Sequence, residues 1–473
     1  MMRGDKMRTL VFFPLDATGD LLKKGSTMDE IEENYNPNGF FDKVYVISPK
    51  DRVDNYGTLI FLKVELSEIQ GLVAQIKPDV IRANAGFFCS DIAVACRIQG
   101  IPIMISVHDS LFERINQSIV FADQVVCISN IVKKAVINCT GISDNKLTYL
   151  PRYVDTKIFQ KKHDKDIFCK LDTKYGMGKH ILHVGRKEEQ KNLENTILAL
   201  KYLPEEYCLI AVGRGEIEKY QEVALKEGVS DRVFFEEGLS HEELSYFYSW
   251  CNCMCTPSRW EGFGLVFIEA CACEAAVVTS DIAPMNEYLT DSESALLIKD
   301  IENPKEIAEK IAQACQDTEA IRQMKKNALK VAMKFDRNYA FKKEVENYKK
   351  LISDGPDLMA EGMFFNECSK LKLPVVIYGA GANGVCFLQY LKERGKNPLF
   401  FIDQSLQKQG RMIDGIKIHS LSKLKDIDEE YVVVVTPFHR KKIVDDLRLK
   451  KIAFMEMEWY QTLMEMKGGG RDN

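Results

Sequence analysis

The chain has 473 residues, which is too long for one hydrophobic core and allows two to four domains. Its net charge of −5, with Lys and Arg interspersed among Asp and Glu, argues against a nucleic-acid partner, because proteins of that class concentrate basic residues. No apolar run approaches the roughly 20 residues that span a bilayer, which leaves only peripheral membrane contact open.

The first 165 residues alternate between β-rich runs and helical or polar stretches, a pattern that predicts a parallel sheet covered on both faces. The expected strands are 10–14, 43–47, 79–81, 103–107 and 124–128. A charged stretch at 161–166 interrupts the pattern. We therefore predict a first domain over residues 1–165.

A second alternation follows, and its first strand is expected at 180–185. Further strands are expected at 207–212, 232–235, 253–257, 276–280 and 295–298. From residue 304 to 352 the chain is rich in Lys, Glu and Ala at helical spacing, which predicts a pair of helices packing against the earlier domains. These features predict a second doubly wound domain over 166–352.

A turn signal, Asp354-Gly355-Pro356-Asp357, favours a linker over 353–372. The remaining residues, 373–473, begin with a strand, a glycine turn and a helix start, which predicts a third and smaller α/β domain. The turn contains Gly379, Gly381 and Gly384, and Asp403 closes the next strand. This is the spacing of a dinucleotide fingerprint, with the acid placed for a ribose hydroxyl.

The chain has 14 cysteines, and five of them gather between residues 251 and 273. Cys251, Cys253 and Cys255 alternate, as residues on one face of a strand do, whereas zinc ligands are usually separated by two to four residues. Buried packing is the favoured interpretation, and no metal site is predicted. The polar start of the chain does not resemble a secretory leader, so a reducing cytoplasm is expected.

The segment 258–270 places two carboxylates, Glu261 and Glu269, around a glycine turn that opens into a predicted helix. Unpaired N–H groups and the positive end of the helix dipole suit a phosphate, and a carboxylate about a turn later can accept from ribose hydroxyls. An ordinary strand-to-helix turn with acidic residues near its helix start is the alternative.

A basic loop, Gly185-Arg186 to Lys191, follows the first strand of the second domain. Two open α/β domains in tandem form a cleft at the carboxyl ends of their strands, where ligands usually bind. Arg186 and Lys191 would suit a diphosphate leaving group in that cleft. For this loop alone, a solvated Lys/Glu-rich turn is the alternative.

Together, Gly185-Arg186, Lys191, Glu261 and Glu269 match in order and spacing a pattern of the retaining glycosyltransferases of family 4, and the chain from about 80 to 298 resembles that family. The resemblance implies the GT-B fold, in which two doubly wound Rossmann-like domains face a cleft; here a third, smaller Rossmann-like α/β domain follows. It also implies an enzyme that transfers a hexose from a nucleoside-diphosphate sugar to a glycan or lipid-linked glycan acceptor, as in surface polysaccharide biosynthesis.

The resemblance assigns roles to individual residues. Arg186 and Lys191 would bind the diphosphate, Glu261 the donor sugar, Glu269 the ribose, and His108 would lie near the transferred sugar. Further residues would line the donor side, namely Gly185, Gly238, Leu239, Phe263, Gly264 and Leu265. No metal or other cofactor is required for such a transfer. The resemblance implies a cytoplasmic enzyme and leaves contact with the inner face of the membrane open.

The chain also departs from the family's pattern. It carries Arg152-Tyr153-Val154-Asp155 where an Asn-Gly-Val-Asp turn is usual. The glycine-rich loop after the first strand is missing, with Lys24-Gly25-Ser26 as a weak substitute. These departures leave the acceptor side open.

The third domain resembles small Rossmann-like modules found beside sugar-modifying enzymes, which implies a dinucleotide or a nucleotide sugar as its ligand. Three alternatives stay open: an NAD(P)-dependent sugar-modifying enzyme, a catalytically silent nucleotide-sugar-binding protein, and a degenerate third domain used for packing. The donor base and sugar, the acceptor, the linkage and the oligomeric state are not predicted.

Overall fold

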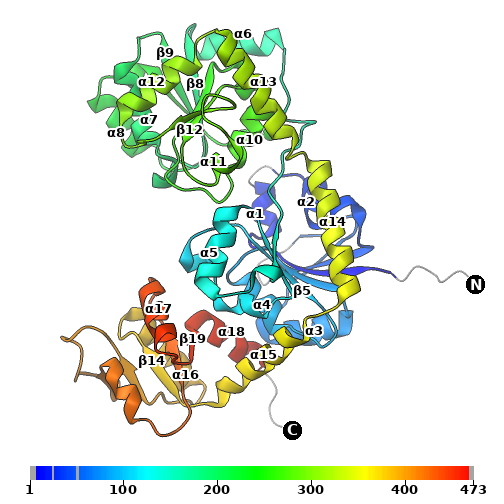
Figure 1. Ribbon diagram of the computed structural model, residues 1–473, viewed down its shortest axis with the longest axis vertical. Helices are drawn as coiled ribbons and strands as arrows, with labels where there is room; N and C mark the ends of the chain where they lie inside the picture. The colour runs from blue at the N-terminus through cyan, green and yellow to red at the C-terminus, as the bar shows by residue number, and fades with distance from the viewer. Residues whose placement is uncertain (1–6, 24–25, 49–52, 468–473) are drawn as a thin grey trace, which may run out of the picture.

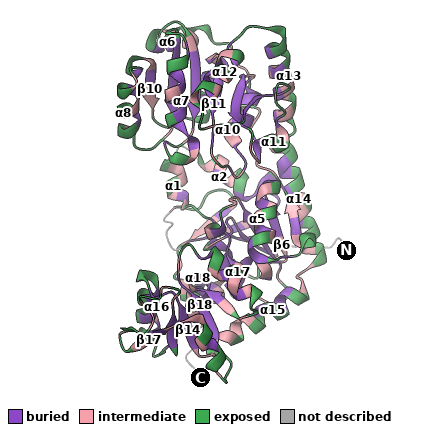
Figure 2. Cartoon of the chain, turned by 60° about the vertical axis from the view of Figure 1, so that its left-hand side comes forward, coloured by how far each residue is buried: buried purple, intermediate pink, exposed green. Residues whose placement is uncertain are grey.

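The computed structural model describes residues 7–23, 26–48 and 53–467, which form three β-sheets with helices around them. Figure 1 shows the second sheet and its helices at one end of the molecule, the first domain in the middle and the C-terminal domain at the other end. Buried residues fill the strands of all three sheets, and exposed residues gather on the outer faces of the helices (Figure 2). Each sheet is therefore the centre of its own α/β layer structure, as predicted.

The first sheet has seven parallel strands in the order β3-β2-β1-β4-β5-β6-β7. The five strands expected here are present, and two edge strands, β3 and β7, were not predicted. The strands are β1 Thr9–Phe13, β2 Lys43–Ile47, β3 Leu59–Leu62, β4 Val80–Ala83, β5 Ile103–Val107, β6 Gln124–Cys127 and β7 Leu147–Tyr149. The helices are α1 Thr18–Lys23, α2 Met28–Tyr35, α3 Leu66–Ile76, α4 Cys89–Ala95 and α5 Asn130–Thr140.

The second sheet has six parallel strands in the order β10-β9-β8-β11-β12-β13, which is the classic doubly wound order. Its strands are β8 Lys179–Val184, β9 Tyr207–Val212, β10 Val233–Glu236, β11 Cys253–Thr256, β12 Val277–Ser280 and β13 Leu296–Ile298. The helices are α6 Lys165–Tyr175, α7 Leu193–Ala199, α8 Glu218–Lys226, α9 His241–Trp250, α10 Leu265–Ala272 and α11 Met285–Tyr288. In both sheets the strand order reverses beside the first strand, and ligands of such sheets bind at that point.

Three helices, rather than the expected pair, follow the second sheet: α12 Pro304–Ala314, α13 Glu319–Met333 and α14 Arg337–Asp354. The side chains of Thr318 and Asp336 cap the second and third of them, which divides the charged run twice. The third helix returns to the first domain (Figure 1), where Tyr348 is buried against Phe40 and Phe41. It therefore joins the two domains by packing as well as by sequence.

The third sheet has the order β16-β17-β15-β14-β18-β19, and only β16 runs antiparallel. Its strands are β14 Val375–Tyr378, β15 Phe400–Ile402, β16 Met412–Ile413, β17 Ile416–His419, β18 Val432–Val435 and β19 Phe454–Glu456. Its helices are α16 Ala382–Glu393, α17 Lys441–Leu449 and α18 Met457–Lys467. The parallel strands thus repeat the Rossmann order in a smaller unit.

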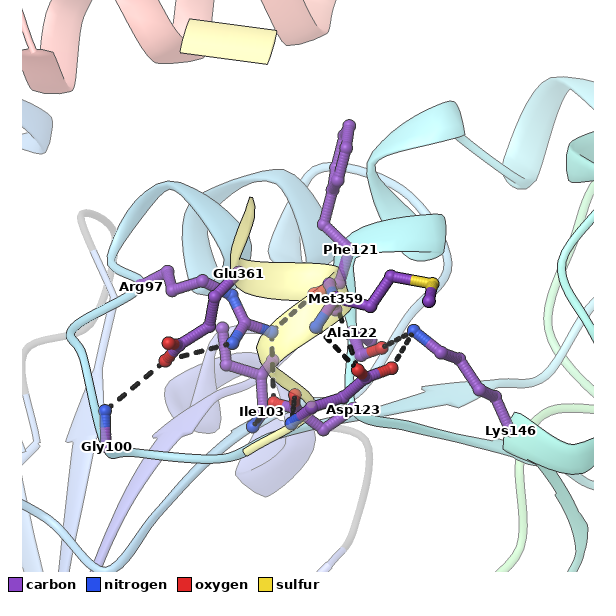
Figure 3. Close-up of polar contacts among 11 residues, drawn as sticks. Arg97, Gly100, Ile103, Phe121, Ala122, Asp123, Lys146, Met359 and Glu361 are labelled. Carbon is purple, nitrogen blue, oxygen red and sulfur yellow. Dashed lines mark hydrogen bonds and ion pairs between the residues drawn. The ribbon is translucent and has the colours of Figure 1, made fainter. Parts of the chain in front are cut away.

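The expected linker, 353–372, is mostly the helix α15 Leu358–Ser369, and it is fixed to the first domain. Arg97 is fully buried there, and its guanidinium donates to Asp123 at 3.0 Å and lies 3.7 Å from Glu361 of α15 (Figure 3). Asp123 also accepts from the backbone N–H of Asp357 at 2.7 Å. The Asp357 carboxylate in turn pairs with Lys146 at 2.7 Å. A charged network therefore anchors α15.

Aromatic and polar contacts fix the C-terminal domain to the first domain as well. The rings of Phe121, Phe364 of α15 and Trp459 of α18 pack in one cluster, with centroid distances of 6.0 to 6.5 Å. In a buried cluster, Arg440 pairs with Glu456 at 3.0 Å and donates to Asn116 of the first domain at 3.0 Å. The first and third domains therefore share one buried interface.

We predict that Arg97→Leu destabilises the protein by about 3–5 kcal/mol, because removal of one partner leaves two buried carboxylates without their cation. Urea or thermal unfolding would measure the loss. The matched control is Arg322→Leu, which breaks exposed pairs with Asp317 and Glu319 and should leave the unfolding midpoint unchanged. Equal midpoints for the two variants would contradict the anchoring role of Arg97.

Candidate functional site

Lys191 and Glu261, which the sequence assigns to two different parts of a donor, form one buried ion pair. The Lys191 Nζ lies 2.5 Å from Glu261 Oε1, and the Ser258 hydroxyl donates to the same oxygen at 2.8 Å. Gly185 makes room for the pair, since a Cβ at this position would come within 2.9 Å of the Lys191 side chain. The pair therefore lies at the carboxyl end of β8, beside the glycine turn.

Arg186 lies on the outer side of the same loop. Its side chain is 61% exposed and pairs with Glu188 at 3.0 Å. The neighbouring Lys187, which the sequence did not single out, is buried and donates to the backbone carbonyls of Gly213 and Glu236. Lys187 thereby holds together the ends of β8, β9 and β10, whereas Arg186 is the more accessible cation.

The glycine turn at 262–264 lies between the second and the first domain. Gly264 has a φ of 82° and precedes α10, so this residue needs the left-handed conformation that glycine adopts at low cost. The hydroxyl of Ser129 in the first domain donates to the Gly262 carbonyl at 2.7 Å. A Cβ on Gly262 would lie 2.3 Å from the carbonyl oxygen of His108. The turn therefore makes a backbone-to-backbone contact across the cleft.

Phe263 of this turn and Glu269 of α10 are both buried. The Tyr288 hydroxyl donates to the Phe263 carbonyl at 2.7 Å, which fixes the shape of the turn. Glu269, one turn into α10, accepts from the Tyr248 hydroxyl at 3.2 Å. Burial raises the pKa of Glu269, and His241 and the Tyr248 hydroxyl oppose that rise only in part.

A cavity of about 390 Å³ lies between the two domains. His108 and Asn84 line it from the first domain. Leu265 and Glu269 of α10 and Arg337 of α14 line it from the second domain. Burial, then the charges of Arg152 and Arg82, lower the pKa of His108 to about 3. His108 is therefore a neutral side chain at the cavity wall.

The structure brings only some of the predicted residues to this cavity. Of those, His108, Leu265 and Glu269 line it, while Arg186, Lys191 and Glu261 are not among the residues that line it. Gly238 is exposed, with the side chain of Arg214 3.5 Å from the position a Cβ would take, and Leu239 is half-buried. Lys24 and Gly25 lie outside the described residues.

Several cavity residues were not predicted as site residues, and Arg82, Arg152 and Arg337 are the cationic ones. The only sequence signal for them was the departure at Arg152-Tyr153. Arg82 and Arg337 lie in a strand and at a helix start, where no motif marks them.

In the third domain, the carboxylate of Asp403 binds the backbone of the glycine turn. Asp403 accepts from the backbone N–H of Ala380 and of Ser405, each at 2.9 Å, and pairs with Lys408 at 3.1 Å. Burial alone would raise the pKa of Asp403, but these hydrogen bonds and the charge of Lys408 outweigh it and lower the pKa. Gly384 allows the helix α16 to approach, because a Cβ there would lie 1.9 Å from the carbonyl of Gly379. Around Gly381, no atom lies within 4 Å of a built Cβ in the described part of the chain.

Among residues 7–23, 26–48 and 53–467, no three His, Cys, Asp or Glu side chains gather as a metal ion would need. The five cysteines between 251 and 273 are buried and free. In the same part of the chain, no helix has both the length and the apolarity to cross a bilayer.

Three family models match the chain. Residues 29–158 match "Glycosyltransferase Family 4", and residues 166–331 match "Glycosyl transferases group 1". These two matches, both to glycosyltransferase families, cover most of the first two domains. Residues 306–453, which run from α12 into the third domain, match "C-methyltransferase C-terminal domain".

Curated relatives of this chain include the serotype-specific mannosyltransferase WbdA of Escherichia coli, which is 25% identical over 245 residues. That match covers 50% of this chain and 30% of the relative. The O-antigen chain mannosyltransferase RfbU of Salmonella typhimurium is 28% identical over 169 residues, covering 35% of this chain and 44% of RfbU. The chain thus spans less than half the length of these relatives.

Solved structures with the same fold include Anabaena Alr3699/HepE in complex with UDP and glucose, with a TM-score of 0.58 and 19% identity. It covers 73% of this chain and 100% of the neighbour. WaaG, a glycosyltransferase involved in lipopolysaccharide biosynthesis, has a TM-score of 0.56 and 15% identity, covering 72% of this chain and 99% of WaaG. Both confirm the two-domain fold.

We predict that Gly262→Ala lowers turnover at least tenfold, because the new methyl group would displace the His108 backbone and open the cleft. Steady-state kinetics would measure turnover, and nucleotide affinity should change far less. Gly71→Ala is the control, since Gly71 lies on the exposed face of α3 with no atom within 4 Å of a built Cβ in the described chain. Full activity in Gly262→Ala would show that the close contact is not needed.

Proposed function

We propose that this protein is a retaining glycosyltransferase that moves a hexose from a nucleoside-diphosphate sugar to a glycan or lipid-linked glycan acceptor. The observation that carries the proposal is the buried Lys191–Glu261 pair beside a glycine turn that itself touches the first domain. The family matches and the mannosyltransferase relatives support the same reaction class. A role in surface polysaccharide assembly follows from those relatives' names and is part of the proposal.

The proposed chemistry uses the chain's own charges. In it, Lys191 moves from Glu261 to the departing diphosphate, and Glu261 then accepts from a hydroxyl of the donor sugar. The N-terminal end of α10 adds a positive dipole where negative charge develops. Cations and the helix end would thereby stabilise the leaving group without a metal ion.

The donor is proposed from the relatives and neighbours. One relative is named as a GDP-mannose-dependent mannosyltransferase of Mycolicibacterium smegmatis, and a neighbouring structure contains UDP-glucose. GDP-mannose and UDP-glucose are therefore the first donors to compare by thermal shift, because a ligand that binds only the folded protein raises its unfolding temperature.

Lys191→Ala is expected to lower turnover at least tenfold, since it removes a cation from the developing phosphate charge, and tenfold corresponds to about 1.4 kcal/mol. Turnover is measured with the donor that gives the larger thermal shift. Because Lys191 also neutralises Glu261, the unfolding temperature is measured in parallel, and Lys191→Ala/Glu261→Gln restores a neutral site if folding suffers. Lys201→Ala, at an exposed pair with Glu227, is the control. Normal turnover in a folded variant would remove the leaving-group role.

For the third domain we propose nucleotide or dinucleotide binding at the turn of Gly379, Gly381 and Gly384. The Rossmann strand order and the position of Asp403 beside the Ala380 N–H support it. An NAD(P)-dependent activity is the alternative for the whole chain, and a redox response on addition of NADH would favour it.

Asp403→Ala in the full chain should abolish binding of NADH at the third domain, followed by its fluorescence, and leave sugar transfer nearly unchanged. Lys408→Ala is the control, because it keeps the carboxylate and removes only the cation beside it. If Asp403→Ala binds NADH as the unchanged protein does, or if neither binds it, the third domain does not bind dinucleotide at this turn.

A further inference from the structure

Three arginines line the cavity between the first two domains, and two of them are neutralised within the protein. Arg82 is buried and pairs with Glu344, and it also donates to the hydroxyls of Tyr348 and Ser106. Arg337 pairs with Glu33 at 2.5 Å and with Asp155 at 2.8 Å. Neither cation is available to a ligand without loss of these pairs.

Arg152 differs from both. It is half-buried in the cavity wall, and no acidic side chain of the described residues lies within 4 Å of its guanidinium. Its guanidinium carbon lies 5.8 Å from the centroid of the neighbouring Tyr153 ring. An arginine that is partly removed from water and has no counter-ion favours an anionic ligand, because a charge-assisted pair offsets the cost of its burial.

The charge of Arg152 reaches the interior of the cavity. After burial, it is the next cause that lowers the pKa of His108, ahead of Arg82. His108 stays neutral near pH 7 and does not add a second positive charge. Arg152 is therefore the cation that an incoming group would meet on the first-domain wall.

Most acids of the cavity are already engaged. Glu33 and Asp155 pair with Arg337, and Glu30 lies 3.5 Å from His241. Burial raises the pKa of Glu269, which also accepts from Tyr248. These side chains are thus held by partners of their own rather than by Arg152.

The position of Arg152 separates it from the proposed leaving-group site. It follows β7 in the first domain, two residues before Val154, which bridges to Asp336 of the second domain. Arg186 and Lys191 lie in the second domain, outside the described lining of this cavity. The chain therefore places cations at two separate points of the cleft.

We propose that Arg152 binds an acidic group, a phosphate or a carboxylate, on the acceptor, and that the acceptor of this enzyme is anionic. The inference rests on the proposed function, since it names the chemistry of the acceptor in that cleft. Arg152 is a specificity residue in this proposal, because it contacts the acceptor away from the bond that forms. A planar guanidinium with several donors suits either oxyanion.

The test compares three small probes, glucose, glucose 6-phosphate and glucuronic acid, by calorimetry on the full chain. Each titration is run with UDP, with GDP and without nucleotide, so that a diphosphate occupies the other cationic site. We expect one anionic probe to bind at least tenfold more tightly than glucose, and the stronger of the two names phosphate or carboxylate as the ligand. Equal affinities, or no binding of any probe, would overturn the proposal.

Arg152→Gln should remove the preference for the anionic probe and leave UDP and GDP affinity within twofold, while Arg152→Lys should keep part of the preference. The matched control is Arg394→Gln, which removes an arginine 3.7 Å from the ring of Tyr390 in the third domain and should change nothing. An unchanged preference in Arg152→Gln, or an equal loss of nucleotide affinity, would overturn the acceptor role.

The two proposals fail in different ways. If neither nucleoside diphosphate binds, the proposed transfer fails, yet the titrations without nucleotide still show whether Arg152 selects an anion. If nucleotide binds and Lys191→Ala is inactive while the three probes bind with equal affinity, the proposed sugar transfer is supported and the proposed anionic acceptor is rejected.

Discussion

The cleft depends on one backbone contact, the approach of Gly262 to the carbonyl of His108. A side chain at residue 262 would overlap that oxygen, so the contact requires glycine. The hydroxyl of Ser129 closes the contact from the first domain, and Tyr288 holds the turn from behind. Because α10 begins at this turn, the same contact sets the position of the helix N-terminus and of Glu269 relative to the first domain. The cavity wall and the proposed leaving-group site therefore share a single geometric constraint.

The three domains are joined unequally. The third domain and α15 bury aromatic rings and charged groups against the first domain, around Phe121 and Arg97. Apart from α14, which packs on the first domain, the second domain meets the first through polar contacts, the ring pair Phe159–Tyr248 and a short backbone bridge between Val154 and Asp336. Buried aromatic contacts cost more to separate than exposed polar ones. If the cleft opens, we expect the first and third domains to move as one body and the second to move against them.

Most of the architecture could be predicted because parallel strands are buried on both faces and read as continuous apolar runs. The edge strands β3 and β7 escaped prediction because they are short and only partly buried. The 353–372 segment was read as a linker because its Gly-Pro turn is a strong local signal. Its anchoring depends on Arg97 and Asp123, more than 200 residues earlier, and no local pattern carries that information.

The candidate site shows the same limit at the level of single residues. The ordered motif found Lys191, Glu261 and Glu269, but it could not show that the first two neutralise each other across 70 residues. Arg152 was visible only as a departure from a familiar turn, and its lack of a counter-ion is a property of the folded chain. Sequence patterns identify residues that resemble those of relatives, whereas charge balance in a cavity depends on all the side chains that fold around it.

In both proposed nucleotide sites, the carboxylate is already bound by groups of the protein. Glu261 accepts from Lys191 and Ser258, and Asp403 accepts from Ala380 and Ser405 and pairs with Lys408. A ligand must therefore exchange partners with the protein rather than fill a set of unpaired groups. The exchange is easier for a diphosphate at Lys191, because a phosphate replaces one anionic partner of the lysine with another. At Asp403 a ribose hydroxyl would replace a backbone N–H and compete with a cation, so this exchange is less favourable. The donor site is thus better supported by charge balance than the site in the third domain.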